Sequence, residues 1–250
     1  MTKRPKMPRP MRPGQVMSGQ PRFSIRLARR HAIWVAAAIA LIVLAASPGA
    51  APRADIQSGG GSADAALDAR VKKFLEQRRG TWRDLNVPAE DGQFLHDLIV
   101  KHKFTRALEI GTSTGHSGVW IAWALSKTGG RLTTLEIDPR RHEQALANFK
   151  EAGVDRYIDA RLGDAHELTR TLAGPWDFVF SDADKDWYAN YLAAVWPKVQ
   201  PGGCFTAHNV SMRGGGIGDF LTALRALPDG QTTIDRTSSA GISVTCKTRG

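Results

Sequence analysis

Acidic residues stand at the ends of successive apolar runs in this chain. Glu136 lies at the end of the run 131–137, Asp164 follows the run 157–162, and Asp182 follows the run 176–181. An earlier run, 107–110, leads into the loop 111–117, which reads Gly-Thr-Ser-Thr-Gly-His-Ser. Glycines let a backbone approach a ligand closely, and an acid at the next strand end can accept hydrogen bonds from both hydroxyls of a ribose. Together these positions predict a nucleoside-binding site.

The elements that must position these residues alternate regularly. Hydrophobic periodicity predicts strands at 107–110, 131–137, 157–162, 176–181, 204–208, 232–236 and 242–247. It predicts helices at 63–80, from residue 88, at 116–127, from 139 to about 152, and at 166–172, 185–198 and 218–226. We therefore expect an α/β fold, a Rossmann-like doubly wound sheet of seven strands. The sheet should be mostly parallel with an antiparallel edge strand and helices on both faces. Ligands of such sheets bind outside the carboxyl ends of the strands.

The glycine loop alone is weak evidence, because a tight strand-to-helix turn has the same composition. Its spacing is G-x-x-x-G rather than the G-x-G-x-x-G of dinucleotide-binding proteins. This spacing argues against a nicotinamide dehydrogenase.

The formal net charge of +10 is concentrated at the N-terminus. Residues 1–31 contain nine Lys or Arg and no acid, which leaves 34 − 9 = 25 basic residues against 24 acidic ones in the rest. The folded part is therefore nearly neutral, so we expect no nucleic-acid partner.

The N-terminal segment divides into three parts before the folded domain. Residues 1–31 form a basic, Pro-rich tail that we expect to be disordered, 32–52 a hydrophobic signal or anchor segment, and 53–62 a flexible Gly-rich linker. The folded domain should cover 63–250. This pattern predicts a domain that is exported or anchored in the membrane, with membrane contact if the segment is not cleaved. A cytoplasmic protein with a misassigned start site is the alternative.

Only two cysteines occur, Cys204 and Cys246, without the spacing of a metal site. We expect two buried thiols. A disulfide is the alternative if the domain is exported, because both residues fall in late strands of one sheet.

Three motifs resemble those of one enzyme family. The stretches 108–117 and 176–188, with Val-Gln-Pro-Gly-Gly at 199–203, are similar to the cation-dependent O-methyltransferases, which include catechol and caffeoyl-CoA O-methyltransferases. The stretches 87–95 and 241–247 resemble the same family, so the resemblance spans about residues 65–248. It implies S-adenosylmethionine as cofactor and a small hydroxylated molecule as methyl acceptor.

The resemblance also implies site residues. The positions implied for cofactor binding are Val87, Glu109, Gly111, Thr112, Ser117, Glu136, Asp164, Ala165, Asp182, Asp184 and Tyr191. A divalent cation, Mg²⁺ or Mn²⁺, would be bound by Asp182, His208 and Asn209. Lys185 would take the proton of the acceptor hydroxyl or stabilise the phenolate, with Asp182 and His208 as its catalytic partners.

One position departs from the family pattern. The family has Asp-Asn after the fifth strand, whereas this chain has His208-Asn209. An imidazole suits Mn²⁺, Fe²⁺ or Zn²⁺ better than Mg²⁺, so the cation could differ or be absent. If the metal is lost, His208 could act as the general base.

Three functional hypotheses follow. The leading one is an enzyme that transfers methyl from S-adenosylmethionine to a phenolic or catechol-like hydroxyl with the help of a divalent cation. The alternatives are a metal-independent methyltransferase with His208 as base, and a membrane-tethered module that binds the cofactor without turnover. The resemblance also implies that a homodimer could form.

Overall fold

The computed structural model of the protein describes residues 59–248. The predicted basic tail, the hydrophobic segment 32–52 and the first residues of the predicted linker lie outside this range. Within it, no helix combines the length and the apolar character that crossing a bilayer requires.

Seven strands form a single sheet in the described residues. Their bounds are β1 Arg106–Ile110, β2 Arg131–Glu136, β3 Ile158–Leu162, β4 Trp176–Ser181, β5 Val199–Ala207, β6 Gly230–Asp235 and β7 Ile242–Lys247. The strand order is β3-β2-β1-β4-β5-β7-β6. Neighbours among β1 to β5 pair in parallel, whereas β7 pairs antiparallel with both β5 and β6. The predicted fold class is confirmed.

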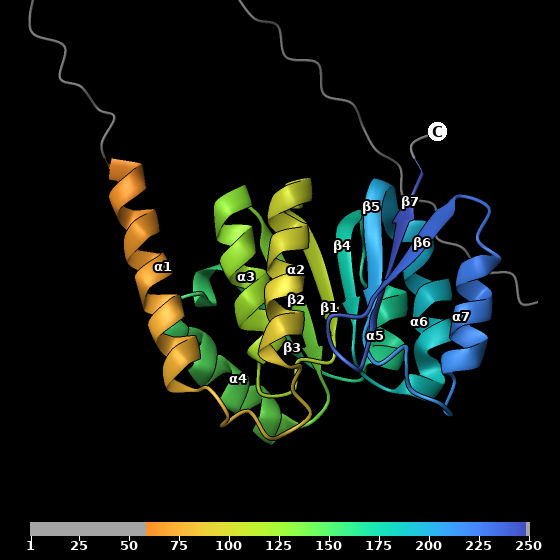
Figure 1. The fold of residues 1–250 in the computed structure, drawn as a ribbon, viewed down its shortest axis with the longest axis horizontal. Helices are drawn as coiled ribbons and strands as arrows, with labels where there is room; N and C mark the ends of the chain where they lie inside the picture. The colour runs from red at the N-terminus through yellow and green to blue at the C-terminus, as the bar shows by residue number, and fades with distance from the viewer. Residues whose placement is uncertain (1–58, 249–250) are drawn as a thin grey trace, which may run out of the picture. The chain divides into compact units, whose positions relative to one another are not determined.

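Helices cover both faces of this sheet, in which β4 is the central strand, with β1 and β5 on either side of it (Figure 1). One group is α1 Gly59–Gln77, α2 Ala89–His102, α3 His116–Thr128 and α4 Pro139–Ala152; the other is α5 Ala165–Thr171, α6 Tyr188–Val195 and α7 Ile217–Arg225. Each group packs its own hydrophobic core against the sheet. Successive side chains of a strand point to opposite faces, so Ala107 joins the core under α1 to α4 while Leu108 joins the core under α5 to α7.

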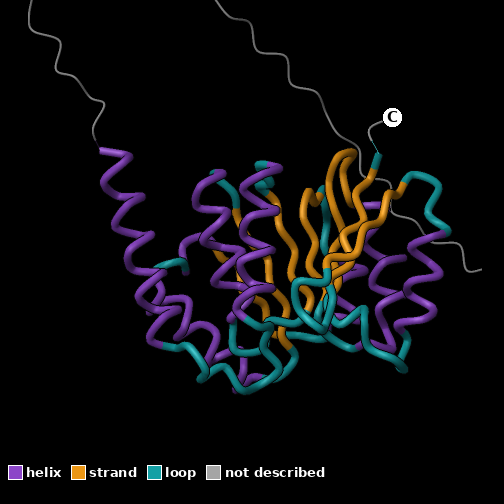
Figure 2. The backbone as a smooth tube through the Cα atoms, in the orientation of Figure 1, coloured by secondary structure: helices purple, strands orange, loops and turns teal. Residues whose placement is uncertain are grey.

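The loops that follow the parallel strands gather along one edge of the sheet, at the bottom of Figure 2. The strand order reverses between β1 and β4, because the chain leaves β1 toward β2 and returns to pair β4 on the other side of β1. Such a switch point opens a crevice at the carboxyl ends of the strands. The fold therefore brings the predicted site residues to one edge.

Three predicted elements differ from their observed bounds by more than two residues. Strand β5 begins at Val199 rather than at residue 204. Helix α1 begins at Gly59, inside the predicted linker and ahead of residue 63. The predicted helix 185–198 is divided into the 3-10 turn Lys185–Trp187, α6, and the 3-10 turn Trp196–Lys198. Asp184 caps the first turn by accepting a hydrogen bond from the backbone N–H of Asp186 at 3.0 Å. Pro197 lies in the last turn, where it supplies no backbone N–H.

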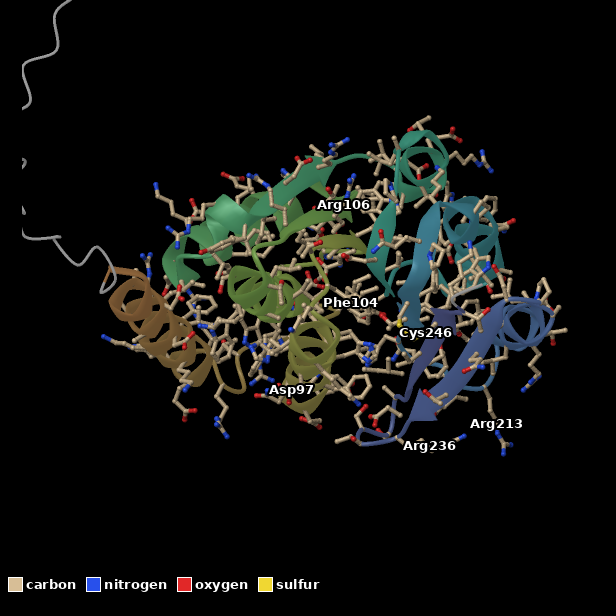
Figure 3. All side chains as sticks on the ribbon, turned by 90° about the horizontal axis from the view of Figure 1, so that it is seen from above. Asp97, Phe104, Arg106, Arg213, Arg236 and Cys246 are labelled. Carbon is tan, nitrogen blue, oxygen red and sulfur yellow. A yellow bond between two sulfur atoms is a disulfide. The ribbon has the colours of Figure 1, made fainter. Side chains whose placement is uncertain are left out.

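The expectation of two buried thiols is wrong, because Cys204 and Cys246 form a disulfide. Cys204 on β5 lies directly opposite Cys246 on β7, with their Cα atoms 4.0 Å apart. Figure 3 shows the labelled Cys246 with its sulfur beside the neighbouring strand. The strand register decides this pairing, and the sequence does not show the register.

Candidate active site

A cavity of about 580 Å³ opens at the carboxyl ends of the parallel strands. Ten predicted site residues line it: Gly111, Glu136, Asp164, Ala165, Asp182, Asp184, Lys185, Tyr191, His208 and Asn209. They come from the segments that follow five successive parallel strands. The other four, Val87, Glu109, Thr112 and Ser117, are buried and do not form its wall.

Gly111 is the position where the glycine loop needs a glycine. Its φ is +98°, and an added Cβ would lie 2.6 Å from the backbone oxygen of Asp182. The loop is joined to β2 by the backbone N–H of Ser113, which donates to Oε2 of Glu136 at 2.7 Å. A side chain at residue 111 would push the ends of β1 and β4 apart and narrow the cavity.

Glu136 is held in place by backbone donors. In addition to Ser113, the N–H groups of Ile137 and Asp138 donate to Oε1 at 3.0 and 2.9 Å. Each carboxylate oxygen has more than one acceptor site. The carboxylate can therefore accept further hydrogen bonds from a ligand in the cavity without moving.

Glu109 is fully buried behind this wall. Its Oε2 accepts a hydrogen bond from Thr134 Oγ1 at 2.5 Å, and Oε1 has no hydrogen-bond partner among the described residues. Burial raises the pKa of Glu109 to about 7, although hydrogen bonds from Ser117 and Thr134 oppose the shift. An orphaned buried acceptor is expensive, so Oε1 is a candidate contact for a donor group of a ligand.

Aromatic rings lie at the end of the cavity beside Asp164 and Ala165, and of these rings the sequence analysis predicted only Tyr191. Asp164 caps α5 by accepting from the N–H of His166 at 2.8 Å. The His166 ring stacks on Trp187 with ring centroids 4.2 Å apart and lies 5.8 Å from the Tyr191 ring. The flat surfaces of these rings beside Ala165 suit a planar base.

Asp182, Lys185 and His208 are brought into contact. Lys185 Nζ donates to Asp182 Oδ1 at 2.7 Å, and His208 Nδ1 lies 3.2 Å from Asp182 Oδ2. The second ring nitrogen of His208, Nε2, lies 2.7 Å from Oδ2 of Asp91. Burial alone would lower the pKa of His208, but the hydrogen bonds to Asp182 and Asp91 outweigh it and raise the pKa to about 9.

Asp91 is the principal residue that sequence reasoning missed. It is fully buried on α2, and its Oδ2 also accepts from Ser238 Oγ at 2.8 Å. Asp91, Leu95 and Ile99 recur at helical spacing, and all three are buried. An acid on the apolar face of a helix was the signal that could have identified it.

Asn209, the third predicted metal ligand, stands at the cavity with φ +60°. Across residues 63–248, no group of three or more His, Cys, Asp or Glu side chains is placed to hold a metal ion. Asp182, His208 and Asn209 do line the same cavity, but two of them are already engaged with other side chains.

Comparison with known protein families identifies the family to which the chain belongs. Residues 62–219 match the family described as O-methyltransferase, which is more than half of the 250 residues. The chain belongs to the O-methyltransferase family. The resemblance predicted from the Gly111 and Asp182 motifs is thereby confirmed.

Individual members of the O-methyltransferase family show the same relationship. A catechol O-methyltransferase of Niastella koreensis is 37% identical over 130 residues, which cover 50% of this chain and 58% of the relative. A caffeoyl-CoA O-methyltransferase of Medicago sativa is 33% identical over 139 residues, which cover 53% of this chain and 56% of the relative. The chain therefore spans less than two thirds of the length of these curated relatives. The O-methyltransferase TomG of Streptomyces achromogenes, solved in complex with SAM, matches at TM-score 0.62 and 27% identity, over 75% of this chain and 96% of TomG.

Proposed function

We propose that the described domain transfers a methyl group from S-adenosylmethionine to a hydroxyl oxygen of a small phenolic, catechol-like molecule. The observation that carries the proposal is the cavity in which the Gly111 loop, Glu136 and Asp164-Ala165 follow successive strands. The family membership and the names of the catechol and caffeoyl-CoA relatives support it.

The residues present fit S-adenosylmethionine. Glu136 offers acceptor sites to ribose hydroxyls, and Ala165 and the His166 ring offer a flat surface to adenine. Behind the wall, Glu109 has a buried Oε1 without a partner, which suits the ammonium of the methionine end if the cofactor reaches past the wall. Gly111 keeps the backbone open to close approach. When bound, this cofactor supplies a methyl carbon activated by a positively charged sulfur.

Lys185 is the residue that acts on the acceptor. Its ammonium lines the cavity and is held by Asp182 Oδ1 and the carbonyl of Ala183, at 2.7 and 3.2 Å. A positive charge at this point lowers the pKa of an acceptor hydroxyl and stabilises the phenolate after its proton has left to solvent. The phenolate oxygen then forms the bond to the methyl carbon, and the electron pair of the broken bond stays on sulfur.

The divalent cation that the resemblance implies does not fit these side chains. A ligating histidine needs a free ring lone pair, whereas both nitrogens of His208 face carboxylate oxygens. Both oxygens of Asp182 are engaged by Lys185 and His208. We therefore assign no step to a metal.

Binding and turnover test the proposed function in sequence. Calorimetry on the full chain should show binding of S-adenosylhomocysteine, and Glu136→Ala should weaken it about tenfold or more because hydrogen bonds to a charged group are lost. Glu143→Ala is the matched control, since Glu143 is an exposed acid on α4. A wild type that binds no S-adenosylhomocysteine would refute the proposal. Binding without methylation of any phenol in a broad panel would favour the module without turnover.

The disulfide provides evidence about the cellular compartment in which the protein functions. Structural disulfides persist in oxidising compartments and are rare in the cytosol, so the Cys204–Cys246 bond supports the exported alternative over the cytoplasmic one. We propose that the domain functions on the oxidising side of the membrane. Fractionation of cells, with the thiols of each fraction blocked before electrophoresis, tests this; a reduced, cytosolic protein would contradict it. Membrane contact through residues 32–52 and a homodimer stay predictions.

A further inference from the structure

Four side chains form one continuous chain of contacts beside the cavity. It runs from Asp91 to His208, then to Asp182, and ends at Lys185, with nearest polar atoms 2.7, 3.2 and 2.7 Å apart. The first three side chains are almost entirely buried, whereas the Lys185 side chain is 31% exposed. The chain of contacts therefore presents only its Lys185 end freely to a small molecule.

The partners of His208 determine how many protons its ring carries. A neutral imidazole has one N–H and one lone pair, and a carboxylate oxygen can only accept. Nδ1 faces Asp182 and Nε2 faces Asp91, so both nitrogens donate only if both carry hydrogen. With each nitrogen facing a carboxylate oxygen at hydrogen-bond distance, the ring directs no lone pair into the cavity toward a metal.

Both oxygens of Asp182 are occupied in the same way. One contacts the ammonium of Lys185 and the other lies beside the ring of His208. A divalent cation at Asp182 would stand beside both in a site with little solvent, where repulsion between like charges is weakly screened. It would have to displace Lys185 and take the place of a proton on His208.

We propose that Lys185 and His208 replace the divalent cation in this member of the family, and that Asp91 is the positioning residue that holds His208 against Asp182. The proposal rests on the proposed methyl transfer for its catalytic consequence. Its claim about metal binding stands on the contacts of these four side chains alone.

The network already occupies the carboxylate of Asp182. Lys185 Nζ contacts one oxygen of Asp182 and His208 Nδ1 lies beside the other, so neither oxygen is left open to a further cation. During methylation the acceptor hydroxyl loses its proton to water, the oxygen bonds to the methyl carbon, and the carbon–sulfur electron pair remains on sulfur. Lys185 keeps its proton throughout and provides the charge that a metal would provide.

Asp91 is suited to position His208 because it is itself held. Its Oδ2 accepts from both His208 and Ser238, which joins α2 to the loop between β6 and β7. An amide at this position would keep the shape and lose the negative charge. His208 would then have no anionic partner on that side.

Binding of Mn²⁺ followed by electron paramagnetic resonance tests the metal claim without any need for turnover. The full-length wild type should bind no Mn²⁺ at Asp182, and His208→Asp should gain a site that Asp182→Asn then removes. Asp97→Asn is the matched control, because Asp97 is an exposed acid on the same helix as Asp91 (labelled in Figure 3). A wild-type Mn²⁺ site that Asp182→Asn abolishes would overturn the proposal.

Methylation of catechol supplies the second measurement. The wild-type rate should be unchanged by EDTA, whereas a rate lost in EDTA and restored by Mg²⁺ would overturn the proposal. Asp91→Asn should lower kcat about tenfold or more without weakening S-adenosylhomocysteine binding, as expected for lost transition-state positioning. Asp91→Glu should restore part of the rate, and Asp97→Asn should change neither quantity. If no phenol is methylated under any condition, the proposed function fails, and the Mn²⁺ measurement still decides the metal claim.

Discussion

Replacing Glu109 with glutamine should remove a pH dependence from the stability of the protein. Glu109 is completely buried, and burial raises its pKa from 4.5 to about 7. A carboxyl group whose pKa is higher in the folded state binds more protons there than in the unfolded chain. Its contribution to stability is therefore fully present below pH 4.5 and is lost as the pH rises to about 7.

The size of the effect follows from the two pKa values. Each pKa unit corresponds to about 1.4 kcal/mol, so moving from 4.5 to about 7 makes the ionised Glu109 cost about 3 kcal/mol of unfolding free energy. Glutamine has nearly the same shape and does not ionise. The free energy of unfolding of Glu109→Gln, relative to that of the wild type, should therefore rise by about 3 kcal/mol between pH 4.5 and pH 8.

Urea unfolding of the ligand-free full chain, followed by tryptophan fluorescence across this pH range, measures the difference. The comparison between two proteins cancels the contributions of titrating groups that do not interact with Glu109. Glu143→Gln, a change at an exposed acid, should follow the wild type at each pH. Parallel curves for the wild type and Glu109→Gln would show that Glu109 ionises normally and that the argument from its burial is wrong.

Three further predictions concern the frame of the site. Gly111→Ala should abolish S-adenosylhomocysteine binding measured by calorimetry, since the Cβ would meet the Asp182 backbone at 2.6 Å; Gly129→Ala, which has a similar φ but open space, should retain binding and lose only about 1 kcal/mol. Asp177→Ala should lower the free energy of unfolding measured in urea by about 3 kcal/mol, because its carboxylate accepts from the backbone N–H groups of Thr105 and Arg106, both at 2.7 Å, and these donors would be left without a partner. Reduction of the Cys204–Cys246 disulfide should cost about 4 kcal/mol in a comparison of unfolding with and without reductant, from the entropy of a loop with sequence separation 42; an unchanged midpoint would show that the bond constrains the unfolded chain little.

The success of the sequence-based prediction depended on how local each signal was. The apolar runs and the turn residues around them placed all seven strands and the loop after each one, because a residue's neighbours along the chain determine these features. The positions Gly111, Glu136 and Asp164 followed from the same rule, since parallel strands bring their carboxyl ends to one edge.

The features that were missed depend on pairs of residues far apart in the chain. Cys204 meets Cys246 only because β5 and β7 pair in one particular register. Asp91 meets His208 across 117 residues of sequence. Periodicity cannot supply such contacts, because it shows which face of an element is buried and not what that face touches.

The contact with Asp91 changes the role that we infer for His208. Read alone, it is a family ligand position with a poorer donor for Mg²⁺, which suggests a weaker metal site. Between two buried carboxylates it is a cationic donor, and a buried pair of acids without it would be strongly destabilising. Asp91 and His208 therefore depend on each other. The ring of His208 gives the buried carboxylate of Asp91 a hydrogen-bond partner, and that carboxylate gives Nε2 of His208 an acceptor. Ser238 adds the loop between β6 and β7 to this contact, so the chemistry at Lys185 depends on three segments that the fold brings together.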